Sequence, residues 1–509
     1  MKHSARLSSN RRQFLATAAA FALAPRALLA KSNPVAARPA AEIANDPRRP
    51  QFHLLPAKNW MNDPNGPIFF NGKYHMFFQY NPHAAVWGDM SWYHSVSPDM
   101  LHWTHLPLAF EPTAGGPDAF GCFSGSAIAV GKRVYVVYTG VVESTPDKAT
   151  IRDGSDKLRE SQCLVFSDDP NLIHWTKVPK PVVPLPPEGL AITGFRDPSA
   201  WRQDDTYYMT VGSGVARLGG CVLLYRSKDL NTWEYLHPLT SGTWNGKKTP
   251  NPCDDGEMWE CPEFFALDGM HVLIYSTLGK VFWQSGQLDA STMKFTPLKT
   301  GLLDLDAFYA PKTQLDAKGR RILWGWIPER RNDAAMLEAG WSGIMSLPRV
   351  MHVDSDGTLR LQVLPETATL RAGTVPSQET RAGVLKTLRK ASGEVTCVGR
   401  GDKSFEVSIS ADDAEIIRVS YSPEKHSFLT DEHEIVLEPH DQPTLHAFVD
   451  GSVIELILGD RIGYTKRFYY EGLTAPDIRV HATGNDEVTM NAWKIEPISS
   501  NRLTTARTA

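Results

Sequence analysis

The chain has 509 residues, 53 of them basic and 57 acidic, and its formal net charge is −4. Charged residues make up 22% and hydrophobic residues 42% of the chain, a balance that excludes extended disorder, and the lack of a basic excess argues against a nucleic-acid partner. Gly and Pro together number 38 + 36 = 74, and with 14 Trp they indicate a β-rich protein with many turns.

Residues 1–30 are predicted to be a signal peptide. They hold five basic residues and no acidic one, with an apolar run from Phe14 to Ala24 that is too short to span a bilayer. Arg11-Arg12 before this run indicates twin-arginine export; the alternatives are a mitochondrial presequence or an unstructured tail. No later apolar stretch reaches membrane-spanning length. We therefore expect a mature protein of net charge −4 − 5 = −9, periplasmic or secreted, with no membrane segment.

Residues 31–48 are rich in Ala, Pro and Arg and predict a linker, and residues 48–350 predict a β-propeller. Short β-type runs alternate with turns throughout this region, without a useful helical period. A polar turn followed by an aromatic residue recurs four times, at Trp103, Trp175, Trp233 and Phe295, with gaps of 72, 58 and 62 residues. Such a repeat is typical of four-stranded blades, the alternative being chance recurrence of Ser-Asp-Trp turns.

Residues 351–380 are polar and predict a linker, and residues 381–500 predict a β-sandwich. Strand-like runs alternate there, and Asp450-Gly451 predicts a hairpin turn. The whole chain is therefore expected to be all-β.

Six cysteines lack a C-x-x-C pair, the 16 histidines lack metal spacing, and no Gly-rich phosphate loop is present. We therefore expect no metal and no cofactor. We also expect few or no disulfides, because a twin-arginine substrate folds in the reducing cytoplasm.

Three acidic segments stand out. They are Trp60-Met61-Asn62-Asp63-Pro64-Asn65-Gly66, Phe195-Arg196-Asp197-Pro198 and Trp259-Glu260-Cys261-Pro262-Glu263. Taken singly, an Asp before Pro is typical of a turn or cap. On a propeller, however, the innermost strands line one funnel, so these carboxylates can converge. Two carboxylates about 5–5.5 Å apart make a retaining glycosidase, whose acid needs a raised pKa. Burial near Trp259 and Cys261 would raise the pKa of Glu260.

Together these segments resemble the signature motifs of glycoside hydrolase family 32, the invertases and exo-fructanases. Further matching segments are Phe78-Gln79-Tyr80-Asn81-Pro82, Phe123-Ser124-Gly125-Ser126-Ala127, Asp306-Ala307-Phe308-Tyr309-Ala310, Trp324-Gly325-Trp326 and Gly340-Trp341-Ser342-Gly343. The resemblance runs roughly from residue 50 to residue 495. It implies a five-bladed β-propeller followed by a C-terminal β-sandwich.

The resemblance also implies residue roles. Asp63 resembles the nucleophile that attacks the fructosyl C2, and Glu260 resembles the acid/base. Asp197 with Arg196 resembles the pair that binds fructose hydroxyls and stabilises the transition state. The remaining expected pocket residues are Asn62, Gln79, Trp87, Phe123, Ser124, Tyr309 and Trp326.

Four further residues are secondary candidates. Cys261 is expected to tune Glu260, or else to be an inert buried thiol. Glu263 is expected to cap a strand, and Asp306 to hydrogen-bond near the acid/base. Asp89 stands where plant sucrose-specific relatives tend to carry Asn, which leaves the preferred fructosyl donor open.

The predicted function is that of a secreted retaining β-fructosidase. It would hydrolyse terminal β-D-fructofuranosyl residues of sucrose, levan or inulin, with a small-molecule or polymeric fructoside as its partner. One alternative is a fructosyltransferase that uses the same covalent intermediate. A non-catalytic fructan-binding protein is disfavoured because Asp63 and Glu260 are both present. An inverting or arabinan-active five-bladed relative is disfavoured by the intact segment 60–66. The sequence carries no sign of oligomeric state.

Overall fold

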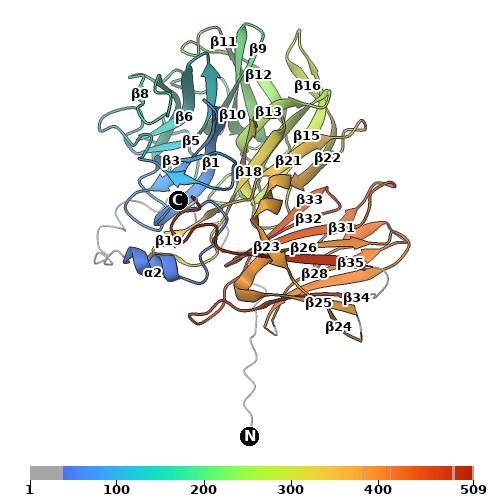
Figure 1. Cartoon of the computed structure of the whole chain (residues 1–509). Coiled ribbons are helices and arrows are strands. Elements are labelled where there is room, and N and C mark those ends of the chain that lie inside the picture. Colours follow the sequence, from blue (N-terminus) through green and yellow to red (C-terminus); the bar gives the residue numbers. More distant parts are fainter. Residues whose placement is uncertain (1–37, 382, 413, 484–487, 507–509) are drawn as a thin grey trace.

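The computed structural model describes residues 38–506 except 382, 413 and 484–487 (Figure 1). The predicted signal peptide of residues 1–30 therefore lies outside the described residues, as does most of the linker predicted for 31–48. Five sheets arranged as blades precede two larger sheets, so the predicted five-bladed propeller followed by a β-sandwich is confirmed. In the described part of the chain, no helix is long and apolar enough to cross a membrane.

Each blade is an antiparallel sheet of four main strands in chain order. The first blade contains β1 (Asn59–Phe70), β2 (Lys73–Asn81), β3 (Ser91–Ser97) and β4 (Thr104–His105). The second contains β5 (Gly121–Val130), β6 (Arg133–Glu143), β7 (Leu158–Ser167) and β8 (Thr176–Lys177). The third contains β9 (Ile192–Gln203), β10 (Thr206–Val215), β11 (Gly219–Ser227) and β12 (Glu234–Ser241).

The fourth and fifth blades complete the ring. The fourth contains β13 (Glu260–Leu267), β14 (Met270–Thr277), β15 (Lys280–Asp289) and β16 (Lys294–Leu302). The fifth contains β17 (Tyr309–Leu315), β18 (Arg321–Ile327), β21 (Arg349–Val353) and β22 (Leu359–Val363), with β20 (Ile344–Met345) on β18. Between β18 and β20 lie helix α3 (Asp333–Ala339) and β19 (Trp341–Ser342), which pairs in parallel with β1.

The four sequence repeats are the turns between the third and fourth strands of blades 1 to 4. In each turn an Asp carboxylate accepts backbone N–H groups; Asp229, for example, accepts from Asn231 and Thr232 at 2.9 and 2.8 Å. In the first three turns the tryptophan indole then donates to the carbonyl three residues earlier, as Trp233 does to Leu230 at 2.9 Å, whereas the fourth turn has Phe295 at this position. An Asp that satisfies the turn and an aromatic residue that fixes its exit therefore account for the repeated pattern.

Hydrophobic clusters fill the seams between neighbouring blades. In the seam between the second and third blades, for example, Val137 and Leu164 pack with Val211 and Leu223. Comparable clusters fill the other four seams, including the one that joins the fifth blade to the first. The innermost strands β1, β5, β9, β13 and β17 contact one another in that order around the ring. The funnel is therefore lined by the first strand of every blade.

The linker predicted over 351–380 is wrong for most of its length. Residues 359–363 alternate Leu, Arg, Leu, Gln and Val and form β22, the outer strand of the fifth blade. The connection itself is the 3₁₀ helix Pro365–Leu370, after which β23 (Arg371–Thr374) joins the sandwich. Residues 38–48 likewise include helix α2 (Ala40–Asn45), and the nearby Asp46 accepts a hydrogen bond from Trp341 Nε1 at 2.9 Å.

The C-terminal sandwich has a six-stranded and a seven-stranded sheet. The first has the order β23, β35 (Val488–Ile495), β26 (Ser392–Gly399), β31 (Thr444–Asp450), β32 (Val453–Leu458) and β33 (Ile462–Arg467). The second has the order β24 (Gln378–Glu379), β25 (Gly383–Leu388), β34 (Ile478–Thr483), β27 (Phe405–Ala411), β28 (Ala414–Ser422), β29 (Ser427–Leu429) and β30 (Glu434–Val436). A short 3₁₀ turn, Arg389–Ala391, links β25 to β26. Val395 and Leu456 of one sheet and Val407 and Val480 of the other share one buried core.

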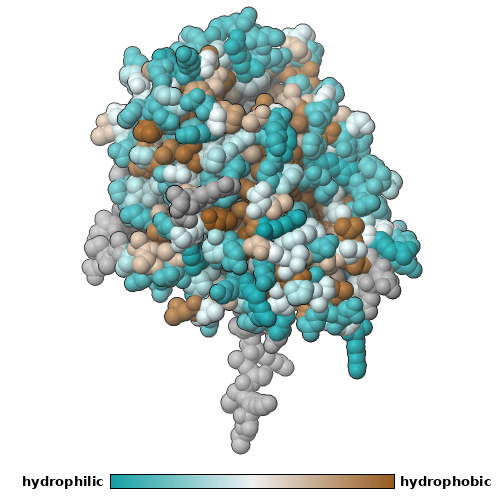
Figure 2. All heavy atoms as spheres, viewed as in Figure 1, coloured by the Kyte–Doolittle hydropathy of each residue, from teal (hydrophilic) through white to brown (hydrophobic). Residues whose placement is uncertain are grey.

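Buried charges join the sandwich to the propeller. His53 bonds through its two ring nitrogens to Asp450 and Glu455 of the sandwich, each at 2.8 Å. Arg349 of the fifth blade lies between Glu455 and Asp304, at 2.6 and 3.0 Å. These hydrogen bonds satisfy groups that would otherwise be costly to bury and fix the contact between the two domains. Outside this interface, the face in Figure 2 is mostly hydrophilic, with apolar residues in small patches.

Candidate active site

A β-bulge at the same level of every innermost strand builds the site. The register with the second strand of the blade shifts after Met61, Cys122, Arg196, Glu260 and Tyr309. Asp197-Pro198, Cys261-Pro262 and Ala310-Pro311 occupy three of these bulges, and their first residues have φ values of 62°, 49° and 49°. A bulge re-aims side chains, and proline fits where the ladder needs no N–H donor. The Asp-Pro pattern therefore marks a bulge in this fold rather than a turn.

Asp63, in the bulge of β1, is held by three donors. Asn62 Nδ2 donates to its Oδ1 at 3.0 Å, while Gln79 Nε2 and Ser124 Oγ donate to its Oδ2 at 3.3 and 2.5 Å. The amide of Asn62 is itself oriented by Trp60 Nε1, which donates to its Oδ1 at 2.7 Å. Three residues predicted to belong to the pocket thus fix the carboxylate of Asp63.

Glu260, the first residue of β13, accepts hydrogen bonds on both oxygens. Arg196 Nε and Nη2 donate to Oε1 at 3.0 and 2.8 Å, and the Tyr309 hydroxyl donates to Oε2 at 2.8 Å. The glutamate therefore joins the third, fourth and fifth blades, and its side chain remains 20% exposed, which leaves it open to a ligand.

Cys261 links the other two carboxylates. Its Sγ lies 3.7 Å from Asp63 Oδ2 and 3.4 Å from Asp197 Oδ2, and its backbone N–H donates to Asp197 Oδ2 at 3.0 Å. Thr139 Oγ1 accepts the backbone N–H of Asp197 at 2.9 Å. One thiol from the fourth blade therefore touches acids from the first and third blades.

Burial and neighbouring charges set the protonation of the cluster. Burial raises the pKa of Asp63, and the charge of Glu260 adds to this effect although hydrogen bonds from Ser124 and Asn62 oppose it. Burial raises the pKa of Asp197 to about 7, against the opposing charge of Arg196. Burial would also raise the pKa of Glu260, but Arg196 and Tyr309 outweigh it and hold that pKa below its usual range. The expectation that Glu260 has a raised pKa is therefore wrong, and the cause is its contact with Arg196.

The three aromatic residues predicted for the pocket pack in one hydrophobic cluster beside the acids. Trp87 packs edge-on against Phe123, with ring centroids 5.9 Å apart, and Trp326 packs against Trp60 at 5.8 Å. The Trp326 Nε1 atom is buried without a hydrogen-bond partner. Aromatic faces beside hydrogen-bonding groups are suited to a neutral sugar.

Sequence reasoning missed two residues that position Arg196. Glu160, fully buried on β7, accepts from Arg196 Nη1 at 2.9 Å and from the Phe195 N–H at 2.6 Å. Cys253, in the loop before β13, accepts from Arg196 Nη2 at 3.2 Å, and its thiol also hydrogen-bonds Glu260. Neither lies in a recognisable motif; the only signal for Glu160 is an acid within an otherwise strand-like run.

The secondary candidates lie elsewhere. Glu263 is buried, accepts from Lys312 Nζ at 3.1 Å and caps the Thr313 N–H at 3.1 Å, as expected of a structural acid. Asp306 does not contact the acid/base; it pairs with Arg330 at 3.0 Å and with Lys466 of the sandwich at 4.0 Å. Asp89 lies in the loop between β2 and β3 with a φ of 45°.

All six cysteines are buried and unpaired, and within residues 38–506, gaps aside, no three His, Cys, Asp or Glu side chains gather as metal ligands.

Carboxylates that converge in the funnel of a propeller, beside an arginine and aromatic faces, form the type of site that glycoside hydrolysis requires. Residues 53–363 match the glycosyl hydrolases family 32 N-terminal domain, and residues 366–494 match the C-terminal domain of that family. The chain therefore belongs to glycosyl hydrolase family 32 and is a hydrolase of the β-fructofuranosidase type.

Comparisons with individual proteins agree with this assignment. A sucrose-6-phosphate hydrolase of Bacillus subtilis (strain 168) is 30% identical over 495 residues, which cover 89% of this chain and 95% of that protein. A β-fructofuranosidase variant of Bombyx mori in complex with sucrose superposes with a TM-score of 0.76 at 28% identity, covering 90% of this chain and 96% of that one. A fructan 1-exohydrolase of Cichorium intybus in complex with 1-kestose gives 0.72 at 26% identity, covering 89% and 98%.

Proposed function

We propose that this protein is a secreted retaining β-fructosidase that hydrolyses terminal β-D-fructofuranosyl residues of sucrose and of fructans such as levan and inulin. The observation that supports this proposal is the convergence of Asp63, Asp197 and Glu260 from three blades around Cys261 and Arg196. The sucrose and 1-kestose complexes of relatives support fructosides as its substrates. Export rests on the Arg11-Arg12 pair and the apolar run after it.

In the first step Asp63 attacks the fructosyl C2 and Glu260 protonates the leaving oxygen, which gives a covalent fructosyl-enzyme. In the second step Glu260 takes a proton from water, and the water oxygen displaces Asp63. The donors Asn62, Gln79 and Ser124 aim the Asp63 carboxylate and stabilise its ionised form. Asp197 and Arg196 bind fructose hydroxyls, and Trp87, Phe123 and Trp326 pack around the ring.

The first step needs Asp63 ionised and Glu260 protonated, whereas the empty site favours the proton on Asp63 or Asp197. Because these acids interact, the limbs of the pH profile belong to the cluster rather than to one residue. When fructose hydroxyls accept hydrogen bonds from Arg196, the guanidinium would move away from Glu260. The pKa of Glu260 would then rise as the substrate enters.

The decisive experiment separates the two jobs of Glu260. Glu260→Gln should slow sucrose cleavage severely but should cleave an activated aryl fructoside far better, because a good leaving group needs little protonation. Azide, which needs no general base, should rescue the second step and yield fructosyl azide. If both donors lose rate equally and azide changes nothing, Glu260 is not the acid/base.

Asp63→Ala is the matched control. It should lose on the order of 10⁵-fold in turnover on both donors with the fold intact, and any fructosyl azide that it forms from the activated donor should be the inverted α-anomer, because azide then attacks C2 directly in place of Asp63, whereas Glu260→Gln should give the retained β-anomer. Proton NMR of the wild-type reaction should show β-fructose as the first product; initial α-fructose would contradict double displacement. Product analysis with sucrose, inulin and levan separates hydrolysis from transfer, since a fructosyltransferase would release longer oligosaccharides.

A further inference from the structure

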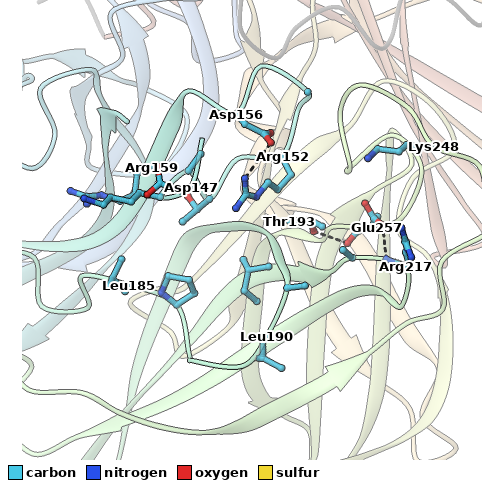
Figure 3. A pocket seen from close by; sticks show the side chains of 18 of the residues that line it. Asp147, Arg152, Asp156, Arg159, Leu185, Leu190, Thr193, Arg217, Lys248 and Glu257 are labelled. Atoms are coloured by element: carbon cyan, nitrogen blue, oxygen red, sulfur yellow. Dashed lines mark hydrogen bonds and ion pairs between the residues drawn. The ribbon is translucent and has the colours of Figure 1, made fainter. Parts of the chain in front are cut away.

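The third blade carries an open cavity at each of its two ends. The larger, of about 840 Å³, opens where β9 and β13 begin, and Figure 3 shows Thr193 and Glu257 on its wall. These residues lie three positions before Arg196 and Glu260 in the chain. The larger cavity therefore adjoins the catalytic acids and belongs to the site already described.

The smaller cavity, which we call the outer hollow, has a volume of about 470 Å³ and is lined by Thr206, Tyr208 and residues of the segment 226–234. It lies where β9 turns into β10 and β11 turns into β12, at the end of the blade away from the catalytic acids. From Asp197 to Gln203, which pairs with Thr206, β9 advances six residues, or about 20 Å at about 3.3 Å per residue. A disaccharide bound at the catalytic acids therefore does not reach the outer hollow, whereas a polysaccharide can contact both.

The lining of the outer hollow carries no net charge. Its two cations are Arg226 and Lys228, and its two acids are Asp229 and Glu234. Arg226 Nε and Nη2 donate to the carboxylate of Glu234 at 2.8 and 3.1 Å. Lys228 Nζ donates to Thr206 Oγ1 at 2.7 Å, and Asp229 Oδ1 accepts backbone N–H groups of its own turn. Because these charges are balanced and already hydrogen-bonded, the hollow favours a neutral polar ligand.

The first blade shows what the backbone of this turn binds. Trp103 occupies the place in the first blade that Trp233 occupies in the third, and each indole donates to the carbonyl three residues earlier. After the sandwich, the chain returns to the turn of the first blade. There the Trp103 N–H donates to Thr505 Oγ1 at 2.9 Å, and Thr504 Oγ1 donates to the Trp103 carbonyl at 2.6 Å. Two hydroxyl groups therefore satisfy both backbone groups, and Trp103 is only 1% exposed.

The equivalent turn of the third blade is uncovered. Among the described residues, no group forms a hydrogen bond with the backbone N–H or carbonyl of Trp233. Trp233 and Tyr208 remain half-buried beside the hollow, and Trp201 stacks on the Tyr208 ring with centroids 5.6 Å apart. Sugars carry neighbouring hydroxyl groups on an apolar carbon frame, as the two threonines of the first blade do, and pack against aromatic side chains. The turn of the third blade therefore offers a donor, an acceptor and an aromatic surface to a sugar.

We propose that the outer hollow is a second sugar-binding site, which holds a neutral polymer of β-fructofuranosyl units on the enzyme while a chain end reaches the catalytic acids. The Trp233 N–H and carbonyl bind hydroxyl groups, and Tyr208 packs against a sugar ring. The inference rests on the proposed fructosidase function for the identity of the sugar. Because binding at the hollow raises the local concentration of chain ends, it lowers KM for the polymer and leaves sucrose cleavage unchanged.

The first test measures binding without degradation of the ligand, in the full chain that carries Asp63→Ala. This protein should be retarded by electrophoresis in gels that contain levan or inulin, and not by dextran, a neutral polymer of glucose. Adding Tyr208→Ala should weaken the association with levan or inulin by about fivefold. Tyr207→Ala is the matched control, because Tyr207 is the next residue of the same strand, points to the opposite face of the sheet and does not line the hollow.

The second test measures turnover in the wild-type background. Tyr208→Ala should raise KM for levan or inulin by about fivefold and keep kcat/KM for sucrose within about twofold of the wild type, whereas Tyr207→Ala should change neither. Thr232→Arg, which blocks the hollow with a long side chain, should act like Tyr208→Ala. His102 and His174 occupy the position of Thr232 in the first two blades, so the turn accepts a larger side chain there. Urea midpoints of the variants control for folding.

Retardation that survives both Tyr208→Ala and Thr232→Arg, or that Tyr207→Ala weakens equally, would overturn the proposal. So would equal retardation by dextran, or no retardation by levan and inulin. If the wild type cleaves no fructoside, the proposed function fails, and the gels still decide the role of the hollow. Retardation of the wild type by levan or inulin that Tyr208→Ala and Thr232→Arg abolish would then support a fructan-binding site without catalysis.

Discussion

Replacing Glu160 with Ala should damage both stability and catalysis, although this residue does not face the substrate. Glu160 is fully buried and accepts from Arg196 Nη1, from the Phe195 N–H and from Thr150 Oγ1 at 2.9, 2.6 and 3.0 Å. The substitution leaves the N–H of Phe195 unsatisfied and removes one partner from a buried ion pair. Such losses cost about 3–5 kcal/mol of unfolding free energy. A displaced Arg196 would also misplace Glu260, for which a loss of about 100-fold in kcat/KM is reasonable.

Urea unfolding followed by tryptophan fluorescence measures the first effect, and initial rates on sucrose measure the second. Glu234→Gln is the matched control, because it breaks an exposed ion pair with Arg226 on the third blade and should change neither quantity measurably. Glu160→Gln keeps an acceptor for Phe195 and should recover part of the stability but little of the activity. If Glu160→Ala unfolds like the control, or keeps activity within twofold, Glu160 does not position Arg196.

Three further predictions concern Arg196, His53 and the Arg11-Arg12 pair. Arg196→Gln removes the cation that lowers the pKa of Glu260, so the basic limb of the kcat/KM profile should move to higher pH, whereas Arg196→Lys should shift it less; an unmoved limb would contradict the assignment. Burial lowers the pKa of His53, but hydrogen bonds to Asp450 and Glu455 outweigh it and raise this pKa to about 9. The contribution of protonated His53 to the free energy of unfolding should therefore be complete below about pH 6.5 and lost as pH rises through 9, and His53→Gln should remove this part of the pH dependence of the urea midpoint. Arg11→Lys with Arg12→Lys should leave precursor in the cytoplasm, and normal export would exclude the twin-arginine route.

The fold was predictable from local chemistry that recurs. In three of the four repeats the Asp and the Trp make the same hydrogen bonds in their turns, so the pattern at Trp103, Trp175 and Trp233 was enough to indicate blades. The outer strand β22 escaped prediction although its five residues alternate apolar and polar side chains, because it is short and lies between the polar segments 354–358 and 365–369. Asp354 to Thr358 forms a plain tight turn there and lacks the Asp-Trp signature.

The candidate site was predictable in its membership but not in its electrostatics. Motif resemblance brought Asp63, Asp197 and Glu260 to attention, and the bulges explain why they meet. The pKa of Glu260 depends on Arg196, which lies 64 residues away in sequence and contacts Glu260 at 2.8 Å. Glu160 escaped for the same reason, since its charge matters only through a partner on another blade. Such cross-blade contacts have no local sequence signal.

The parallel pairing of β19 with β1 has a consequence for biosynthesis. Asn59 and Trp60 must wait for Trp341 and Ser342, so the ring cannot close until 342 − 59 = 283 further residues have been translated. At about 5–20 residues per second, this delay is about 15 to 60 s. During that time the nascent chain is an open arc in which Met76 and Phe78, fully buried in the finished seam, still lack the fifth blade. A ribosome that stops before Trp341 would therefore release an aggregation-prone arc rather than a smaller propeller.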